Sequence, residues 1–334
     1  MLEVLEDKRL IFVTGKGGVG KSTVVAAMGR ALARQGRQTL VVETDAYSAM
    51  KDLYDVELAD SVITPVDPPL HAVNLLASEC IVEIIARIVP SKRIVRSLLN
   101  NRVARLFFNT APGIKQFAIL DQIREFLDQT DGDRPRWDTV IVDLPASGHA
   151  ATFLSVPKTL RDIIKVGPAA DIAERLAEMV GNAAKSAIVA VCLPEEMPVN
   201  ETIEFEEKLE SSLGRGLTVA FANMVHRAPL EPRQKEEFSE LVGRLNREAL
   251  ISETISGGPD DDRVVERVIA GNVLAMDWHE RDERYLKLLH ERLSAPVDEI
   301  PVYYETDGDD IVECVVEHML NPEADEEQSE TLAS

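Results

Sequence analysis

The sequence predicts an α/β protein with a doubly wound, mainly parallel sheet and a helical insertion. Short apolar runs alternate with helical patterns along most of the 334 residues. A glycine-rich turn follows the first apolar run, and aspartates follow two later runs, at strand ends where such sheets bind ligands. No internal repeat is present, so we expect one domain over residues 1–320, with the insertion at about 78–130. Residues 321–334 are acidic and polar, which predicts a disordered tail.

The expected strands are apolar runs bounded by polar or turn-forming residues. In chain order they occupy residues 9–14, 38–43, 71–76, 138–143, 187–192, 218–223 and 299–304. Pro301 lacks a backbone N–H group, so we expect the last strand at a sheet edge. Helices are expected at residues 22–34, near 48–54, over 78–128 with breaks at Pro90 and Pro112, and at 264–293.

The turn after the first strand fits the phosphate-loop pattern G-x4-G-K-[ST]. Its backbone N–H groups and the start of the following helix can cradle a triphosphate. In this pattern Lys21 reaches the β- and γ-phosphates, and is a candidate catalytic residue, while Ser22 is a candidate Mg²⁺ ligand. A purely structural glycine-rich turn is the alternative. The expected nucleotide-binding residues of the loop are Gly15, Lys16, Gly17, Gly18, Val19, Gly20, Lys21, Ser22 and Thr23.

Two aspartates follow apolar strands and are candidates for the hydrolytic chemistry. Asp143 ends the run 139–142, the pattern of a Walker B strand, and is expected to hold Mg²⁺ directly or through water. A turn residue or a helix cap is its alternative. Asp45 is expected to orient the attacking water, with an N-cap of the next helix as the alternative. We expect residues 144–149 to form a turn in which Gly148 lets the backbone approach a γ-phosphate.

Composition restricts the partners and the compartment. The chain has 58 acidic and 36 basic residues and a formal net charge of −22, which repels nucleic acids and anionic lipid, so no nucleic-acid partner is expected. No stretch of about 18 apolar residues occurs, so we expect no integral membrane segment. A signal-peptide pattern is also lacking. The dispersed cysteines Cys80, Cys192 and Cys314 predict buried free thiols in a reducing, cytoplasmic setting.

The string KGGVGKST resembles the deviant Walker A loop of the ParA, MinD, nitrogenase iron protein and arsenite-pump/tail-anchored-protein targeting ATPases. In those families the early lysine, Lys16 in this chain, reaches across a two-fold interface to the phosphates bound by the partner subunit. The resemblance therefore implies a homodimer in which Lys16 is catalytic in trans. A solvated surface lysine is the alternative.

Two further segments narrow the resemblance to the ArsA-like and tail-anchored-protein targeting ATPases. Residues 143–149 resemble the D-T-A-P-T-G-H switch II, and residues 44–48 lie where the group has its D-P-A-x-S switch I. The resemblance implies ATP and Mg²⁺ as cofactors, Asp45 as the residue that positions water, and an adenine contact from Asn223, for which a turn-forming asparagine is the alternative. It also implies five switch residues: Asp45, Ser48, Asp143, Gly148 and His149.

Departures from the family pattern affect metals and cargo. The C-x-x-C pair of many targeting ATPases is absent, so no structural zinc is expected, and no matching set of metalloid-binding cysteines is present. The insertion is rich in Ile and Val, and we favour a closed core over an exposed client groove. The leading function is a homodimeric ATPase that handles a hydrophobic or membrane-protein client. The alternatives are the catalytic subunit of an anion or metalloid efflux system, and a slow positioning or scaffold protein of the ParA/MinD type.

Overall fold

The computed structural model describes residues 2–45, 47–89, 91, 113–230, 234, 235, 238, 264–305 and 307–321. Its strands are β1 (Leu10–Gly15), β2 (Thr39–Glu43), β3 (Thr64–Asp67), β4 (Leu70–Asn74), β5 (Thr130–Asp131), β6 (Arg134–Pro135), β7 (Thr139–Asp143), β8 (Ser186–Cys192), β9 (Val219–Val225) and β10 (Val297–Pro301). Its helices are α1 (Glu3–Glu6), α2 (Lys21–Arg34), α3 (Met50–Leu53), α4 (Ala77–Ile88), α7 (Ile114–Asp128), α8 (Ser147–Ile163), α9 (Pro168–Gly181), α10 (Glu196–Leu213), α13 (Val264–Arg292) and α14 (Gly308–Leu320).

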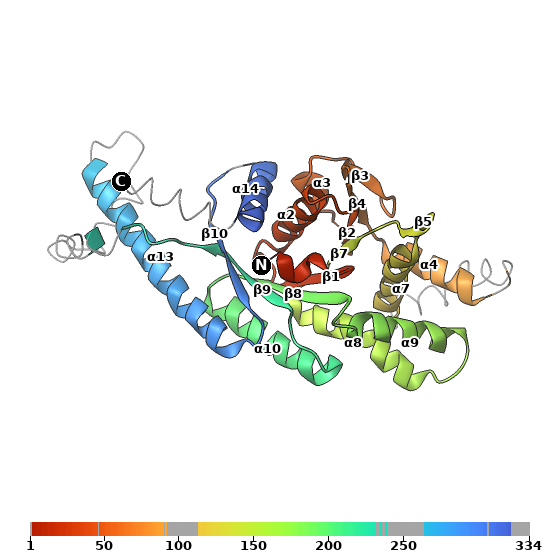
Figure 1. Ribbon diagram of the computed structural model, residues 1–334. Coiled ribbons are helices and arrows are strands. Elements are labelled where there is room, and N and C mark those ends of the chain that lie inside the picture. The colour runs from red at the N-terminus through yellow and green to blue at the C-terminus, as the bar shows by residue number, and fades with distance from the viewer. Residues whose placement is uncertain are drawn as a thin grey trace.

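The strands of the described residues form an eight-stranded sheet in the order β10-β9-β8-β1-β7-β2-β4-β3 (Figure 1). Every neighbouring pair is parallel except β3 and β4. Helices cover both faces of this sheet, which confirms the predicted doubly wound, mainly parallel architecture. The carboxyl ends of the central strands therefore meet at one edge, where a ligand can bind.

The two faces of the sheet pack into two separate cores because side chains alternate along each strand. Along β1, Leu10 and Phe12 belong to the core that α7, α8, α9 and α10 cover. Ile11 and Val13 belong to the opposite core, which α2 and α14 cover. The long helix α13 packs its Leu286 and neighbouring leucines on β8 and β9 in a third, smaller cluster. The strands read as continuous apolar runs because both faces are buried.

Both edge strands of the sheet are irregular. β10 forms one edge, as Pro301 predicted, and its register with β9 shifts between Glu299 and Pro301. The other edge strand, β3, has only four residues, pairs antiparallel with β4, and shifts register between Pro65 and Asp67. None of the described helices combines the length and apolar character that crossing a bilayer requires.

Most of the expected elements occur, with boundaries shifted by a few residues. Three predictions are corrected: residues 147–149 are the first turn of α8 rather than part of a loop, the last strand ends at Pro301, and Cys314 is half-buried rather than buried. Helix α8 starts early because Ala146 is extended and its carbonyl accepts the backbone N–H groups of His149 and Ala150. Elements that the sequence analysis did not assign are α1, β3, β5, β6, α8, α9, α10 and α14.

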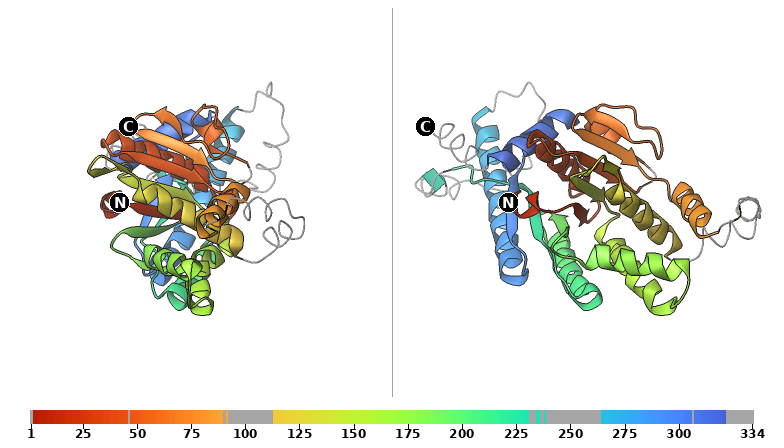
Figure 2. Two further views of the ribbon diagram at one scale, coloured as in Figure 1. Left: turned by 90° about the vertical axis from the view of Figure 1, so that its right-hand side faces the viewer. Right: turned by 45° about the vertical axis from the view of Figure 1, so that its right-hand side comes forward.

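The described part of the predicted insertion packs as ordinary core. Ile81 and Ile84 of α4 and Leu120 and Ile123 of α7 are buried in the cluster that also holds Phe12 of the central sheet. Figure 2 shows α4 and α7 at the opposite end of the molecule from α13. The breaks expected at Pro90 and Pro112, and the tail beyond residue 321, lie outside the described residues.

A glycine in α2 gives a test of this packing. A Cβ atom at Gly29 would lie 2.7 Å from Cγ2 of Val41 and 2.9 Å from the Tyr54 hydroxyl oxygen. Gly29→Ala is therefore expected to lower the free energy of unfolding by about 1–3 kcal/mol, although alanine is the better helix former. Gly271→Ala in α13, where the added Cβ meets nothing within 4 Å, is the control and is expected to be neutral or stabilising. Chemical denaturation measures both variants, and equal effects would contradict the packing argument.

Candidate functional site

The predicted phosphate loop lies at the carboxyl edge of the sheet, between β1 and α2. Gly15 approaches β8 so closely that a Cβ atom there would lie 2.3 Å from the carbonyl oxygen of Val191. Gly18 and Gly20 have φ angles of 87° and 79°, in the left-handed region that favours glycine. Gly17 and Gly18 are exposed, and a Cβ atom added at either would meet nothing within 4 Å, so the space around this part of the loop is open to a ligand.

Three predicted site residues converge below this loop. Lys21 forms an ion pair with Oδ1 of Asp143, and the Ser22 hydroxyl donates to Oδ2 of Asp143 at 2.7 Å. The Lys21 and Asp143 side chains are only 12% and 7% exposed. Burial lowers the pKa of Lys21 to about 8, while the charges of Asp45 and Glu43 act to raise it. The hydroxyl and carboxylate oxygens of Ser22 and Asp143 lie side by side, a donor set that suits Mg²⁺.

The predicted switch I follows β2 and is attached at both ends. The Thr44 hydroxyl donates to the carbonyl oxygen of Asp143 at 3.0 Å. The Glu43 carboxylate accepts hydrogen bonds from the Ser48 hydroxyl and from the backbone N–H groups of Ala49 and Met50. Glu43 therefore caps the start of α3. This contact disfavours the alternative in which Asp45 is the N-cap of that helix. Asp45 is exposed. Its proximity to Lys21 is indicated by its effect on the lysine pKa.

Lys16 forms an ion pair within the same chain. Its Nζ lies 2.9 Å from Oε1 of Glu201 in α10, and both side chains are about one-third exposed. The Ser147 hydroxyl, at the start of α8, donates to Oε2 of the same Glu201 at 3.4 Å. Glu201 therefore joins the loop lysine to the beginning of the predicted switch II segment.

The remaining predicted residues are placed as follows. Gly148 and His149 are exposed in the first turn of α8. The Asn223 side chain is buried at the end of β9, and its Nδ2 donates to the carbonyl oxygen of Val19 at 2.9 Å. Asn223 thus supports the phosphate loop, a contact that the sequence analysis did not anticipate. Val19 is itself buried, and Thr23 is half-buried in the first turn of α2.

Two residues that contact the site were missed by the sequence analysis. Glu43 holds the switch I segment, and Glu201 pairs with Lys16. Glu43 is a charged residue at the end of an otherwise apolar strand, and this pattern is a signal that could have identified it. Glu201 lies in the middle of an acidic helix with many glutamates, so nothing local distinguishes it. Only the folded contact with Lys16 separates Glu201 from its neighbours.

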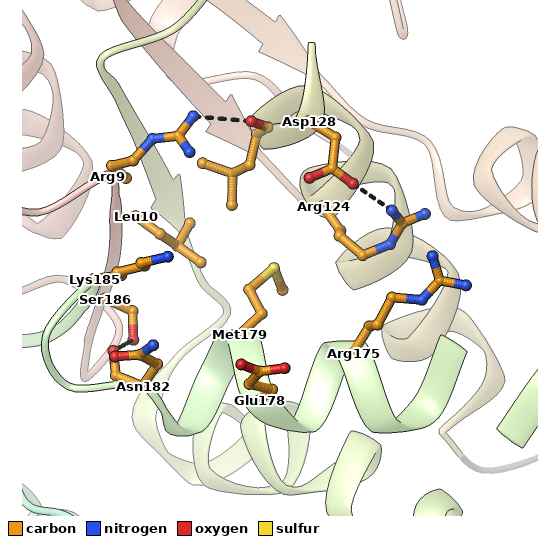
Figure 3. A pocket seen from close by; sticks show the side chains of 11 residues that line it. Arg9, Leu10, Arg124, Asp128, Arg175, Glu178, Met179, Asn182, Lys185 and Ser186 are labelled. Atoms are coloured by element: carbon orange, nitrogen blue, oxygen red, sulfur yellow. Dashed lines mark hydrogen bonds and ion pairs between the residues drawn. The ribbon is translucent and has the colours of Figure 1, made fainter. Parts of the chain in front are cut away.

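Away from this site, two of the cavities that described residues line hold clusters of basic side chains. One, of about 250 Å³, lies at the amino edge of the sheet between α7 and α9 (Figure 3). There Arg9 donates to the carbonyl oxygen of Leu127 at 2.9 Å, and Arg124 pairs with Asp128 at 2.5 Å. The other, of about 1070 Å³, has among its lining residues His226, His279, His290 and His318. No residue of the phosphate loop lines either cavity.

Within the ranges that the structure describes, no group of three or more His, Cys, Asp and Glu side chains could hold a metal ion. The expectation that the protein carries no structural zinc stays a prediction, because a metal can also bind between subunits.

Comparisons with known proteins bear on the same region of the chain. Residues 8–170 match the family model described as an anion-transporting ATPase (ArsA ATPase). The chain is 29% identical to ATPase BagA of Mycobacterium tuberculosis over 279 residues, which cover 77% of each protein. It is 31% identical over 176 residues to an arsenical pump-driving ATPase of Acidiphilium multivorum, covering 51% of this chain and 29% of that relative. It is 25% identical over 245 residues to ATPase GET3 of Kluyveromyces lactis, covering 61% of this chain and 68% of that relative.

The role of Asp143 can be tested against a second aspartate next to the same strand. Asp143→Asn removes the negative charge between Lys21 and Ser22, so the apparent Mg²⁺ affinity measured with a fluorescent ATP analogue is expected to fall at least about tenfold. Asp138→Asn is the control, because Asp138 accepts from the Gln38 backbone N–H at the opposite end of β7. An unchanged Mg²⁺ titration for Asp143→Asn would contradict the assignment.

Proposed function

This chain is an ATPase of the ArsA-like family, and we propose that it works as a Mg²⁺-dependent homodimer that handles a hydrophobic or membrane-protein client. The family predicted from the loop and the two switch segments is thereby confirmed. The observation that carries the proposal is the convergence of Lys21, Ser22 and Asp143 beneath the glycine-rich loop. In this proposal the triphosphate of ATP binds to the loop N–H groups. The positive ammonium group of Lys21 then leaves Asp143 and pairs with the negative phosphate oxygens.

The metal fits the same three residues. Bound Mg²⁺ supplies positive charge that neutralises the β- and γ-phosphate oxygens. In the proposal Ser22 and Asp143 hold it through their adjacent oxygens, and the contact between the two side chains is the observation that supports this. Asp45 then orients the attacking water, because its carboxylate is exposed close to Lys21.

Dimerisation is proposed from the position of Lys16. The ion pair with Glu201 is partly exposed, so it costs little to break and leaves Lys16 available to a second subunit. The carboxyl edge of the sheet also carries two exposed apolar side chains: Tyr47, which follows β2, is 72% exposed, and Met197, one turn before Glu201, is 60% exposed. Apolar side chains beside a charged catalytic residue suit an interface that forms and opens during a cycle.

An efflux subunit is the second candidate, since one relative is named an arsenical pump-driving ATPase. The cysteines count against metalloid binding in this chain. Burial raises the pKa of Cys80 and of Cys192 to about 12, so both remain protonated thiols at neutral pH. A metalloid needs thiolates from several cysteines at one place. The client-handling function is therefore preferred.

The two loop lysines are expected to differ in their effects. Lys16→Ala is expected to abolish ATP hydrolysis while leaving most nucleotide binding, because Lys16 acts across the dimer on the developing charge. Lys21→Ala is expected to weaken both, since Lys21 binds the phosphates of its own subunit. Phosphate release measures hydrolysis, a fluorescent ATP analogue measures nucleotide binding, and the mass from light scattering measures the oligomeric state. Lys208→Ala, on the same helix as Glu201, is the control. A monomeric Lys16→Ala protein with normal turnover would refute the dimer proposal.

The client proposal predicts a change in turnover. A detergent-solubilised hydrophobic peptide is expected to alter the ATPase rate by at least about twofold, because a client that binds one dimer state better shifts the population of that state. A scrambled polar peptide in the same detergent is the control. Stimulation by arsenite or antimonite with no response to the peptide would favour the efflux alternative instead.

A further inference from the structure

Glu43 is a buried carboxylate beside the nucleotide site that the proposed mechanism does not use. It is the last residue of β2 and only 3% exposed. One carboxylate oxygen accepts from the backbone N–H groups of Ala49 at 2.7 Å and Met50 at 3.1 Å. The other oxygen accepts from the Ser48 hydroxyl. A buried charge of this kind is costly, and these three donors compensate for part of that cost.

These hydrogen bonds close the loop that carries Asp45. The N-cap position of α3 is Ala49, which offers no side-chain cap, so Glu43 supplies the acceptor for the first backbone N–H groups of α3. The chain between Glu43 and Ser48 is thereby held at its two ends by one side chain. Asp45 lies inside this closed segment.

The closed segment also begins directly beside Asp143, which is proposed to bind the metal. β2 pairs in parallel with β7, and Glu43 is the register partner of Asp143. Thr44 donates to the Asp143 carbonyl oxygen, which attaches the start of the loop to the same strand end. The charges of Asp45 and Glu43 both act on Lys21, so the three side chains share one electrostatic environment.

We infer that Glu43 is a positioning residue for hydrolysis, which holds the switch I segment so that Asp45 faces the phosphates. The inference rests on the proposed role of Asp45. Small displacements of a group that orients a reactant cost large factors in rate, whereas binding through the phosphate loop does not depend on that group. Glu43 therefore acts on turnover through Asp45 and leaves nucleotide affinity nearly unchanged.

If Glu43 were only a structural cap, its removal would lower stability without changing kcat. A second buried glutamate shows what the loss of a purely structural cap does. Glu206 in α10 is 4% exposed and accepts from the backbone N–H groups of Ser294 at 2.9 Å and Leu217 at 3.4 Å. Leu217 precedes β9, so Glu206 lies at the amino edge of the sheet, away from the phosphate loop. Glu206→Ala is the matched control, with an expected loss of stability and an unchanged kcat per folded molecule.

The experiment compares kcat, nucleotide Kd and unfolding for five variants of the full chain. Glu43→Ala is expected to lower kcat at least about tenfold, with the Kd of a fluorescent ATP analogue within about threefold of the parent. Glu43→Gln is expected to recover most of kcat, since its carbonyl oxygen accepts from Ala49 and Met50 and its amide donates to Ser48. If Glu43→Ala fails to fold, Ser48→Ala removes one of the three donors and is expected to lower kcat about two- to fivefold.

Each outcome decides one claim. Normal kcat in folded Glu43→Ala, a parallel loss in Glu206→Ala, or a Kd that weakens as much as kcat falls would overturn the inference. Without folded Glu43→Ala, parent-like turnover in Ser48→Ala overturns it. Asp45→Asn separates the two proposals. Parent-like turnover in Asp45→Asn removes the proposed water-positioning role, whereas slow Asp45→Asn together with normal Glu43→Ala overturns only the role of Glu43.

Discussion

The ion pair between Lys21 and Asp143 is the interaction on which the arrangement of the site depends. Two nearly buried, opposite charges meet where β1 and β7 end, and each would be costly to bury alone. Register in the sheet places Asp143 beside both Val13 and Glu43, so the lysine at the start of α2 reaches the strand end that carries the proposed metal-binding oxygen. The Asp143 carboxylate thus gives Lys21 the same kind of anionic partner that a phosphate group would give.

Charge balance around this pair explains much of the site. Asp143 pairs directly with the buried Lys21 ammonium group, and the charges of Asp45 and Glu43 also act on it. Burial raises the pKa of Glu43, and its three hydrogen-bond donors stabilise the carboxylate and offset part of that effect. Lys16 has a separate carboxylate partner in Glu201. In the proposed mechanism, nucleotide binding exchanges these internal ion pairs for ion pairs with phosphate, and the difference between the two sets determines the net affinity.

The sequence predicted those parts of the site that follow from local pattern. The loop glycines, Lys21, Ser22 and Asp143 all lie next to apolar strands, and a parallel sheet brings such strand ends together. Contacts between distant segments could not be predicted, because no local signal reports them. Glu201 reaches Lys16 only after α10 has packed beside β8, and Asn223 reaches Val19 only across β8 and β1. The start of α8 was missed because Gly148 indicated a turn, whereas hydrogen bonds to the Ala146 carbonyl begin a helix there.

The irregular strands at the two sides of the sheet have a consequence for assembly. An unpaired strand with regular, accessible N–H and C=O groups is a template for strand addition by another molecule. β3 is short and shifted in register at Pro65, while β10 is shifted at Pro301, so neither offers a continuous row of such groups. Joining of two copies into one continuous sheet, and the aggregation that can follow from it, is therefore disfavoured for this chain. In the proposed dimer, association would depend on side chains and loops, whose contacts can be made and broken with the nucleotide state.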